Sequence, residues 1–367
     1  MSEAELLLGI VVATALAFDF TNGFHDTANA VATSISTKAL RPRVAVGLAA
    51  ILNFAGAFIS LEVAATVASD VVNPSTVTQQ VVFAGLIGAI AWNLLTWYFG
   101  LPSSSSHALI GGMVGSSFAA AGADAVFAGG VVGQVLIPAL VAPMVAFAVA
   151  GLSIVIVYRT VGRQRPGPVT RGFRLGQIVS ASMFALSHGT NDAQKTMGIL
   201  VLALIAHGSL PAEGYDVPLW VILSAATAIG LGTYSGGWRI IRTMGTRVHR
   251  MDPAQVFTAE GAGSAVILAS SHFGFPLSTT HVISGAVVGS GAGKRLSAVR
   301  WGVAGNIVAA WLLTLPAAAA IGAAAYGLTR IFGTGAVGPV VVGLAGIGLI
   351  AIAFARRARA GAPVPAA

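Results

Sequence analysis

The feature that most constrains this chain is a series of apolar stretches, each close to the roughly 20 residues that a helix needs to cross a bilayer. They recur from residue 6 to residue 354. Only 9% of the 367 residues are charged, whereas soluble domains carry about 25%. A soluble fold cannot bury so much apolar surface, so the sequence predicts an all-α polytopic membrane protein that contacts the lipid bilayer directly.

The positive charges gather in short clusters between the apolar stretches, which is typical of loops that stay in the cytoplasm. This pattern explains the net charge of +8 better than binding to nucleic acid does. We therefore predict a multi-pass protein of the cell (inner or plasma) membrane, with the basic loops and the C-terminus in the cytoplasm. The five clusters are Lys38, Arg41 and Arg43; Arg159, Arg163, Arg165, Arg171 and Arg174; Arg239, Arg242, Arg247 and Arg250; Lys294, Arg295 and Arg300; and Arg356, Arg357 and Arg359.

One path across the membrane places all five clusters on the same side. In this path two long helices are broken in the middle and two re-entrant helical hairpins turn back inside the membrane, where irregular backbone is tolerated only if it lines a cavity. The predicted segments of the first half are 6–37 (broken), 44–68, 81–100, the hairpin tip 102–106, 107–121 and 126–158. Those of the second half are 175–206 (broken), 217–234, 257–275, the hairpin tip 276–280, 281–290, 301–329 and a last helix 337–354.

The same plan occurs twice in opposite orientation, and two pairs of motifs support a duplication. Residues 23–29 (GFHDTAN) match residues 189–195 (GTNDAQK), and residues 100–107 (GLPSSSSH) match residues 274–281 (GFPLSTTH). Matched motifs in the same order and at similar spacing indicate an internal repeat. The predicted organisation is one inverted repeat at 1–158, a basic cytoplasmic linker at 159–174, a second inverted repeat at 175–330, and an extra C-terminal transmembrane helix with a short basic tail at 331–367.

Inverted repeats with broken helices place a binding site near the middle of the membrane. Asp26 and Asp192 lie at equivalent predicted breaks, where an ionised carboxylate costs about 2.5 to 3.5 kcal/mol unless a partner binds it. The functional interpretation is a site for a coupling cation or proton, to which Asn22, Asn29 and Asn191 add neutral oxygens. The alternative is that each aspartate only caps the helix that follows it.

The two hairpin tips carry neutral hydroxyls directly before helices. A helix N-terminus offers free N–H groups and a partial positive charge, so these tips predict reversible binding of an oxyanion. N-capping alone is the structural alternative. The hydroxyl residues are Ser104, Ser105, Ser106, Ser278, Thr279 and Thr280.

Other polar residues near these motifs are expected to support the site. Lys195 replaces the asparagine at the position equivalent to Asn29, and either contacts the anion or neutralises Asp192. Histidines beside the motifs are proton carriers or hydrogen-bonded supports, and Asp19 lies near the first predicted break. The remaining supporting candidates are His25, His107, His188, His281, Gln194 and Glu260, the last of which has a helix cap as its alternative role.

These motifs resemble those of the inorganic phosphate transporter (Pit) family of sodium- or proton-coupled phosphate carriers, over nearly the whole chain. Residues 23–30 (GFHDTANA) and 189–195 (GTNDAQK) look like its duplicated Gly-x-Asn-Asp-x-x-Asn signature, and residues 276–281 (PLSTTH) look like its second hairpin. The resemblance implies an ion and phosphate site lined by Asp26, Asn29, Asn191 and Asp192 and closed by the hairpin tips. His25 and Lys195 depart from the signature and are similar to the bacterial low-affinity branch, where proton coupling and co-transport of a divalent metal with phosphate are expected.

The resulting prediction is a symporter of inorganic phosphate that needs no cofactor and is coupled to protons or sodium. A permease for sulfate or another oxyanion is the nearest alternative. A passive channel and an intramembrane hydrolase that uses His107, His281 and the hairpin serines also stay open, although a duplicated inverted site gives a one-way reaction no advantage. The sequence leaves the coupling ion, any metal ligands and homodimer formation undecided.

Overall fold

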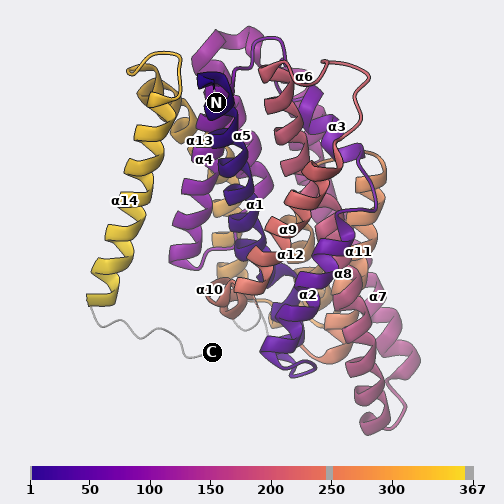
Figure 1. Ribbon diagram of the computed structural model, residues 1–367. Helices are drawn as coiled ribbons and strands as arrows, with labels where there is room; N and C mark the ends of the chain where they lie inside the picture. Colours follow the sequence, from indigo (N-terminus) through magenta and orange to yellow (C-terminus); the bar gives the residue numbers. More distant parts are fainter. Residues whose placement is uncertain (1, 245–250, 360–367) are drawn as a thin grey trace.

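The computed structural model describes residues 2–244 and 251–359, which form a bundle of long helices (Figure 1). Arg247 and Arg250 of the third basic cluster and the tail after residue 359 lie outside the described residues. Within the described part, the only strand-like contact is the isolated bridge between Val72 and Val126, so the all-α prediction is confirmed. Four helical segments are long and apolar enough to cross a membrane: Glu3–Ser36, Gln79–Phe99, Ala128–Val161 and Trp301–Arg330.

The helices follow one another with short connections. The first half contains α1 (Glu3–Ser36), α2 (Pro42–Gly56), α3 (Glu62–Ser69), α4 (Gln79–Phe99), α5 (Ser105–Ala121), a 3-10 turn (Gly122–Ala125), α6 (Ala128–Gly130), a π-helical turn (Val131–Leu136) and α7 (Ile137–Val161). The second half contains α8 (Pro166–His207), α9 (Leu219–Ser235), α10 (Trp238–Arg242), α11 (Pro253–His272), α12 (Thr279–Lys294), a 3-10 turn (Leu296–Ala298), α13 (Trp301–Arg330) and α14 (Val337–Arg359).

Two predicted helix breaks are absent, and this part of the prediction is wrong. α1 and α8 run as single helices of 34 and 42 residues, although each carries a buried aspartate in its middle. The backbone does not need to unwind, because side chains from other helices satisfy these aspartates. The predicted linker 159–174 is also mostly helical, since α8 already begins at Pro166, a residue suited to the first helical position.

A break occurs instead in the second crossing, predicted as one helix over 44–68. There α2 ends at Gly56 and α3 begins at Glu62. The backbone N–H groups of Val63 and Ala64 at the start of α3 donate to the side-chain oxygen of Gln194 on α8, at 2.9 and 3.3 Å. A side chain far away in the sequence therefore takes the place of a local helix cap.

The two halves pack through equivalent contacts. α5 packs against α13 as α12 packs against α7, and α1 packs against α9 as α8 packs against α2. These approaches are so close that they require glycine at corresponding positions. A Cβ atom at Gly115 would lie 2.0 Å from the carbonyl oxygen of Ala319, and one at Gly289 would lie 2.2 Å from the carbonyl oxygen of Phe147.

The basic clusters within the described residues gather toward one end of the bundle. Thr37, just after α1, donates to Gln177 near the start of α8 at 3.1 Å. Tyr158 near the end of α7 and Lys294 at the end of α12 both contact Asp252 before α11, at 2.5 and 3.0 Å. α14 also runs toward this end, which is the lower one in Figure 1. The arrangement agrees with the predicted path, and the assignment of this end to the cytoplasm stays a prediction.

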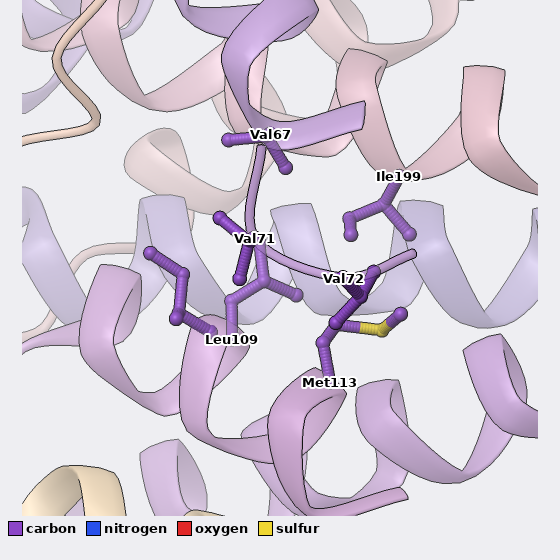
Figure 2. Close-up of a pocket in the computed structure, with 7 residues that line it drawn as sticks. Val67, Val71, Val72, Leu109, Met113 and Ile199 are labelled. Carbon is purple, nitrogen blue, oxygen red and sulfur yellow. The ribbon is translucent and has the colours of Figure 1, made fainter. Parts of the chain in front are cut away.

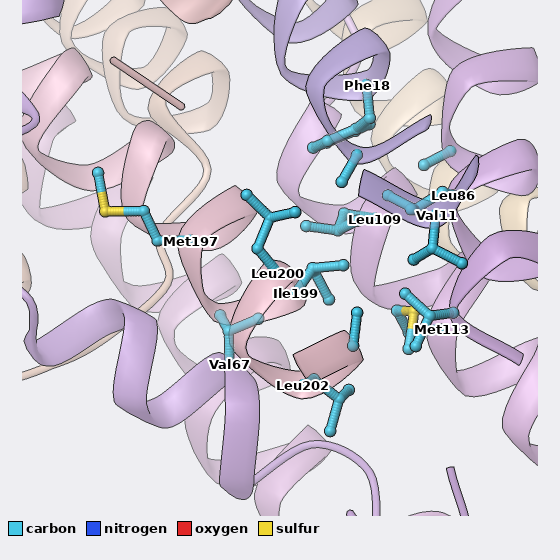
Figure 3. Packing of buried hydrophobic residues seen from close by; sticks show 14 of the residues in the cluster. Val11, Phe18, Val67, Leu86, Leu109, Met113, Met197, Ile199, Leu200 and Leu202 are labelled. Atoms are coloured by element: carbon cyan, nitrogen blue, oxygen red, sulfur yellow. The ribbon is translucent and has the colours of Figure 1, made fainter. Parts of the chain in front are cut away.

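Two apolar clusters separate a polar layer from the two ends of the bundle. The upper cluster, shown in Figure 3, includes Phe18 of α1, Leu109 of α5 and Leu200 of α8. The lower cluster includes Val31 of α1 and Phe184 of α8. The polar residues of α1 and α8 between these positions are therefore enclosed from both sides.

The glycine contacts generate a prediction about stability. Gly115→Ala or Gly289→Ala should lower the melting temperature of the purified protein, because the added methyl group overpacks a backbone contact at a cost of about 1 to 3 kcal/mol. Gly305→Ala is the matched control, since a Cβ there meets nothing within 4 Å. Thermal unfolding in detergent, followed by tryptophan fluorescence, measures the effect. Equal melting temperatures for all three variants would contradict the close approach of α5 to α13 and of α12 to α7.

Asp252 generates a prediction about pH. Burial raises the pKa of Asp252, but hydrogen bonds from the Tyr158 hydroxyl and the Gln255 backbone N–H outweigh it, so the pKa lies below its ordinary value of 3.8. A carboxyl group whose pKa is lower in the folded state than in the unfolded state stabilises the fold at pH values above its unfolded pKa. This stabilisation is lost as the pH falls through the pKa of the folded state. Asp252→Ala should therefore lower the melting temperature at pH 7 through loss of a helix cap worth about 1 kcal/mol.

This difference from the wild type should shrink as the pH approaches 3, because the wild-type carboxylate then becomes protonated. The exposed Glu213 supplies the control Glu213→Ala, for which we expect little change at either pH. A difference between Asp252→Ala and the wild type that is as large at pH 3 as at pH 7 would show that the carboxylate charge is not what stabilises the start of α11.

Candidate functional site

The site is framed by two hairpin tips that the sequence forms in the same way. α4 and α11 are each followed by a glycine with positive φ, Gly100 at 68° and Gly274 at 75°, a conformation that side-chain-bearing residues rarely adopt. A proline two residues later prevents the helix from continuing. New helices then start with Ser104 and Ser278 as N-caps, whose hydroxyls accept hydrogen bonds from the backbone N–H groups of His107 (3.1 Å) and His281 (3.3 Å).

The capping interpretation therefore holds for Ser104 and Ser278, while the next residues of each tip face the centre of the protein. Ser105 donates to Asp26 at 3.2 Å, and Thr279 donates to Asp192 at 3.2 Å. These two contacts occupy equivalent positions in the two halves. Each aspartate is thus held by a hydroxyl from the hairpin of its own half.

The two aspartates meet across one histidine. Nε2 of His188 lies 3.0 Å from Asp192 Oδ2 and 3.9 Å from Asp26 Oδ2. Ligand atoms of these three residues all lie within 4.8 Å of one another, a spacing at which they could hold a metal ion. The sequence predicts His188 as a proton carrier or a support beside the site, and the structure places it between the two aspartates.

A second pair of contacts crosses between the halves. Asn29 of α1 donates to Thr280 at 2.9 Å, and the equivalent Lys195 of α8 donates to Ser106 at 2.6 Å. Lys195 also donates to the Leu277 carbonyl oxygen at 2.6 Å and forms an ion pair with Asp192. Both roles predicted for Lys195 are thus geometrically available, because its ammonium group reaches the aspartate and a hairpin hydroxyl together.

Further polar residues fix the site from behind. His25 lies 2.6 Å from Asp26 through Nδ1 and 3.2 Å from the Thr96 hydroxyl through Nε2. Asn191 donates to Ser271 at 2.8 Å and to the Phe275 carbonyl oxygen at 3.2 Å, which holds the second hairpin. His25 and Asn191 are equivalent positions, so one half uses a histidine and the other an amide for this support.

His107 and His281 are equivalent residues that touch each other. Their rings are edge to face with centroids 4.6 Å apart, and His281 stacks on Trp311 at 4.0 Å. Contact between equivalent residues places the two hairpins side by side at the centre of the bundle. The ring nitrogens of His281 have no hydrogen-bond partner among the described residues, so this pair is a packed support of the tips.

Three predicted residues lie outside the central group. Gln194 caps α3, as described above. Glu260 accepts hydrogen bonds from Thr33 at 2.5 Å and Ser180 at 2.7 Å, toward the lower end. It does not cap α11, whose N-cap is Asp252, so that alternative is wrong. Asn22 lies one turn above Asp26 and makes no contact with the aspartate pair within the described hydrogen bonds.

Sequence reasoning missed several partners. The hydroxyls of Thr96 and Ser103 are hydrogen-bonded to each other at 2.9 Å beside His25, and the carbonyl of Leu277 binds Lys195. On the other side of the site, the side-chain oxygen Oδ1 of Asn53 accepts a hydrogen bond from Nδ1 of His188 at 3.1 Å. Ser103 lies within a recognised motif, and Asn53 stands out in the sequence as a polar candidate within an apolar stretch. Thr96 carries no such signal, and a backbone carbonyl leaves none in the sequence.

The site is closed in this conformation. Asp26, Asp192 and Lys195 are 2%, 0% and 1% exposed. A small cavity nearby does not extend it, because its lining is apolar: Val67, Val71, Val72, Leu109, Ile110, Met113 and Ile199 (Figure 2). An anion in that cavity would find no hydrogen-bond donors. Only the central layer brings together two carboxylates, one ammonium group, hairpin hydroxyls and two helix N-termini among the described residues.

Comparison with known proteins agrees with this geometry. The model of the phosphate transporter family matches residues 22–169 and 163–322. A Mycobacterium tuberculosis protein named "Probable low-affinity inorganic phosphate transporter" is 55% identical to this chain over 333 residues. The matched region is 91% of this chain and 80% of the relative. The Bacillus subtilis relative of the same name is 45% identical over 323 residues, 88% of this chain and 96% of the relative.

A solved structure titled "The sodium-dependent phosphate transporter" has the same fold. It superposes with a TM-score of 0.78 at 24% sequence identity, covering 89% of this chain and 99% of its own. At this identity the likeness supports the fold alone. The family match and the bacterial relatives together carry the assignment, and the chain belongs to the phosphate transporter family.

Proposed function

We propose that this protein is a symporter that carries inorganic phosphate across the cell membrane with protons or sodium ions. The observation that supports this most directly is the convergence of the two hairpin N-termini, Lys195 and the paired Asp26 and Asp192 in one enclosed layer. The hairpin N-termini and Lys195 suit an oxyanion, and the aspartate pair suits a cation. Membership of a transporter family sets aside the hydrolase alternative, and the hairpin serines serve binding.

Phosphate would bind beside the tips of both hairpins. Ser106 and Thr280 supply hydroxyl donors, Lys195 supplies the positive charge, and the first N–H groups of α5 and α12 face the same region. Because each tip belongs to a different half, a bound phosphate would contact both halves at once. A small movement of one half against the other would then loosen the anion and open the site toward one end, as alternating access requires.

The carboxylates also explain a preference for phosphate over sulfate. Hydrogen phosphate carries a hydroxyl that donates a hydrogen bond to a carboxylate such as Asp26 or Asp192. Ionised sulfate has no such donor and would be repelled by the same carboxylate. The permease for another oxyanion stays as the alternative, and it would be favoured if sulfate competed equally with phosphate.

The coupling ion is proposed to bind at the aspartate pair, with Asn29 and Asn191 as nearby polar supports. His188 between Asp26 and Asp192 allows proton transfer, and the same three residues offer nitrogen and oxygen ligands for a divalent metal carried together with phosphate. We further propose that the two motif-bearing halves are inverted repeats, since equivalent residues make equivalent contacts. The basic end is proposed to face the cytoplasm, and two copies of the chain are proposed to form a homodimer.

Uptake of radiolabelled phosphate into proteoliposomes tests this function. Wild-type protein should accumulate phosphate when a pH or sodium gradient is imposed, and the effective gradient identifies the ion. Asp26→Asn and Asp192→Asn should each reduce uptake roughly tenfold or more, the factor that corresponds to about 1.4 kcal/mol. The exposed Asp124 supplies the control Asp124→Asn, which should transport normally.

Added magnesium and a chelator, tested separately, decide whether phosphate moves alone or with a metal. Phosphate entry through the wild-type protein that is the same with and without an imposed ion gradient would favour a passive channel. Entry of sulfate but not phosphate would overturn the proposed substrate.

Lys195 gives a second test. Lys195→Asn restores the residue that the first half has at Asn29 and removes the fixed positive charge beside the anion site. Phosphate uptake should then fall at low sodium, because the negative charges of the anion and the aspartates lose their positive partner. Uptake should recover in part at high sodium if a bound cation takes the place of the ammonium group. Uptake by Lys195→Asn that equals the wild type without sodium would show that the lysine charge is not used.

A further inference from the structure

A second polar layer lies between the central site and the upper end of the bundle. It contains Asp19 and Asn22 of α1, Asn93 of α4 and Thr196 of α8, all of them at most 1% exposed. Among the described residues, no hydrogen-bond partner meets either Asp19 carboxylate oxygen, the Asn22 side-chain oxygen, either polar atom of Asn93, or the Thr196 hydroxyl. The phosphate site described above does not use any of these atoms.

The helices place these residues together. Asp19 and Asn22 are three residues apart and share one face of α1. Thr196 lies one turn above Asp192 on α8, which runs opposite to α1 and packs against it. The Thr196 hydroxyl and the Asn22 side chain face the Asp19 carboxylate.

Asn93 brings the side of α4 into the same layer. Glu3 of α1 accepts a hydrogen bond from the Ala336 backbone N–H at 3.2 Å, and the Gln80 side chain of α4 donates to the Gly335 carbonyl oxygen at 2.9 Å. Both partners lie in the loop after α13, so α1 and α4 begin at the same, upper end. Lower down, His25 contacts Thr96. Asn93 is one turn before Thr96 and therefore lies at the level of Asn22, one turn before His25.

A buried carboxylate without a partner costs several kcal/mol, so a group of this kind is expected to hold a ligand. The Thr196 hydroxyl supports this view, because it does not bond to its own helix as Thr27 and Thr190 do, at 2.7 Å to Gly23 and 2.9 Å to Leu186. It is left available to a ligand in the layer.

The donor set selects the kind of ligand. One carboxylate, neutral amide oxygens and a hydroxyl give hard oxygen ligands with a single negative charge, which suit a monovalent cation.

We propose that Asp19, Asn22 and Thr196, with Asn93 beside them, form an outer binding site for a sodium ion. The site lies about two helical turns, roughly 10 Å, above Asp26 on α1. Asp19 interacts electrostatically with Asp192, His188 and Lys195 of α8, and the aspartate pair is the next group of carboxylates along α1, so an ion released from the outer site would move toward that pair. This inference rests on the proposed symport, because it makes the outer site the entry point of the coupling ion.

Sodium binding to purified protein without phosphate tests the site independently of transport. The background is the double variant Asp26→Asn with Asp192→Asn, in which the central carboxylates are removed. Radiolabelled sodium should still bind to it, measured by scintillation proximity with choline chloride keeping the ionic strength constant. Adding Asp19→Asn should weaken this remaining binding roughly tenfold or more, the range seen when groups that support a metal site are removed.

Thr196 supplies a milder pair of variants in the same background. Thr196→Val keeps the side-chain shape but removes the hydroxyl, and should weaken sodium binding severalfold. Thr196→Ser restores the hydroxyl and should restore the affinity. Asp124→Asn is the control for a carboxylate outside the site and should leave binding unchanged.

Sodium binding that survives Asp19→Asn and Thr196→Val would overturn the outer site. Absence of sodium binding in the double variant, with melting temperatures showing that it is folded, would overturn it as well and leave the central pair as the cation site. Failure of wild-type protein to take up phosphate while sodium still binds in an Asp19-dependent manner would instead overturn the proposed transport function and leave the site standing.

Discussion

The structure depends on keeping two carboxylates close together inside a membrane protein. Asp26 and Asp192 would repel each other strongly in an apolar environment, so both need compensating partners. His188 lies between them, Lys195 pairs with one, and His25 contacts the other. The hairpins complete this arrangement by bringing one hydroxyl to each carboxylate. The long unbroken helices, the glycine contacts and the apolar clusters all serve to hold these few groups in register.

The matched motifs of the two halves supply the frame of the site, and the differences between them supply its chemistry. Equivalent residues make equivalent contacts, as Asn29 with Thr280 and Lys195 with Ser106 show. An amide and an ammonium thus occupy matching positions, and only one of them carries charge. A strictly symmetric site would carry two amides or two ammonium groups around the same carboxylates. Lys195 pairs with Asp192 alone, and this asymmetry is consistent with the cation site proposed at the aspartate pair.

Much of this could be predicted from the sequence, because the informative signals are local. The hairpin tips follow from Gly100 and Pro102 and their equivalents, and the central aspartates stand out as rare charges in apolar helices. The breaks predicted at these aspartates were wrong because helix continuity depends on partners that lie elsewhere in the chain. For the same reason the gap before α3 could not be predicted, since Gln194 of another helix supplies its cap.

The surroundings on the two sides of the central layer do not follow the correspondence between the matched motifs. Asp19 has Ala185 at the equivalent position of the second motif, and Glu260 has Leu86 at the equivalent position of the first hairpin. Each side of the site therefore has a buried carboxylate that the opposite half lacks, and the two differ in their surroundings, since Glu260 is fully hydrogen-bonded to hydroxyls whereas Asp19 is not. In the proposed transport cycle, exchange of the two halves would therefore not exchange these surroundings, and the conformations open to each end are expected to differ in energy.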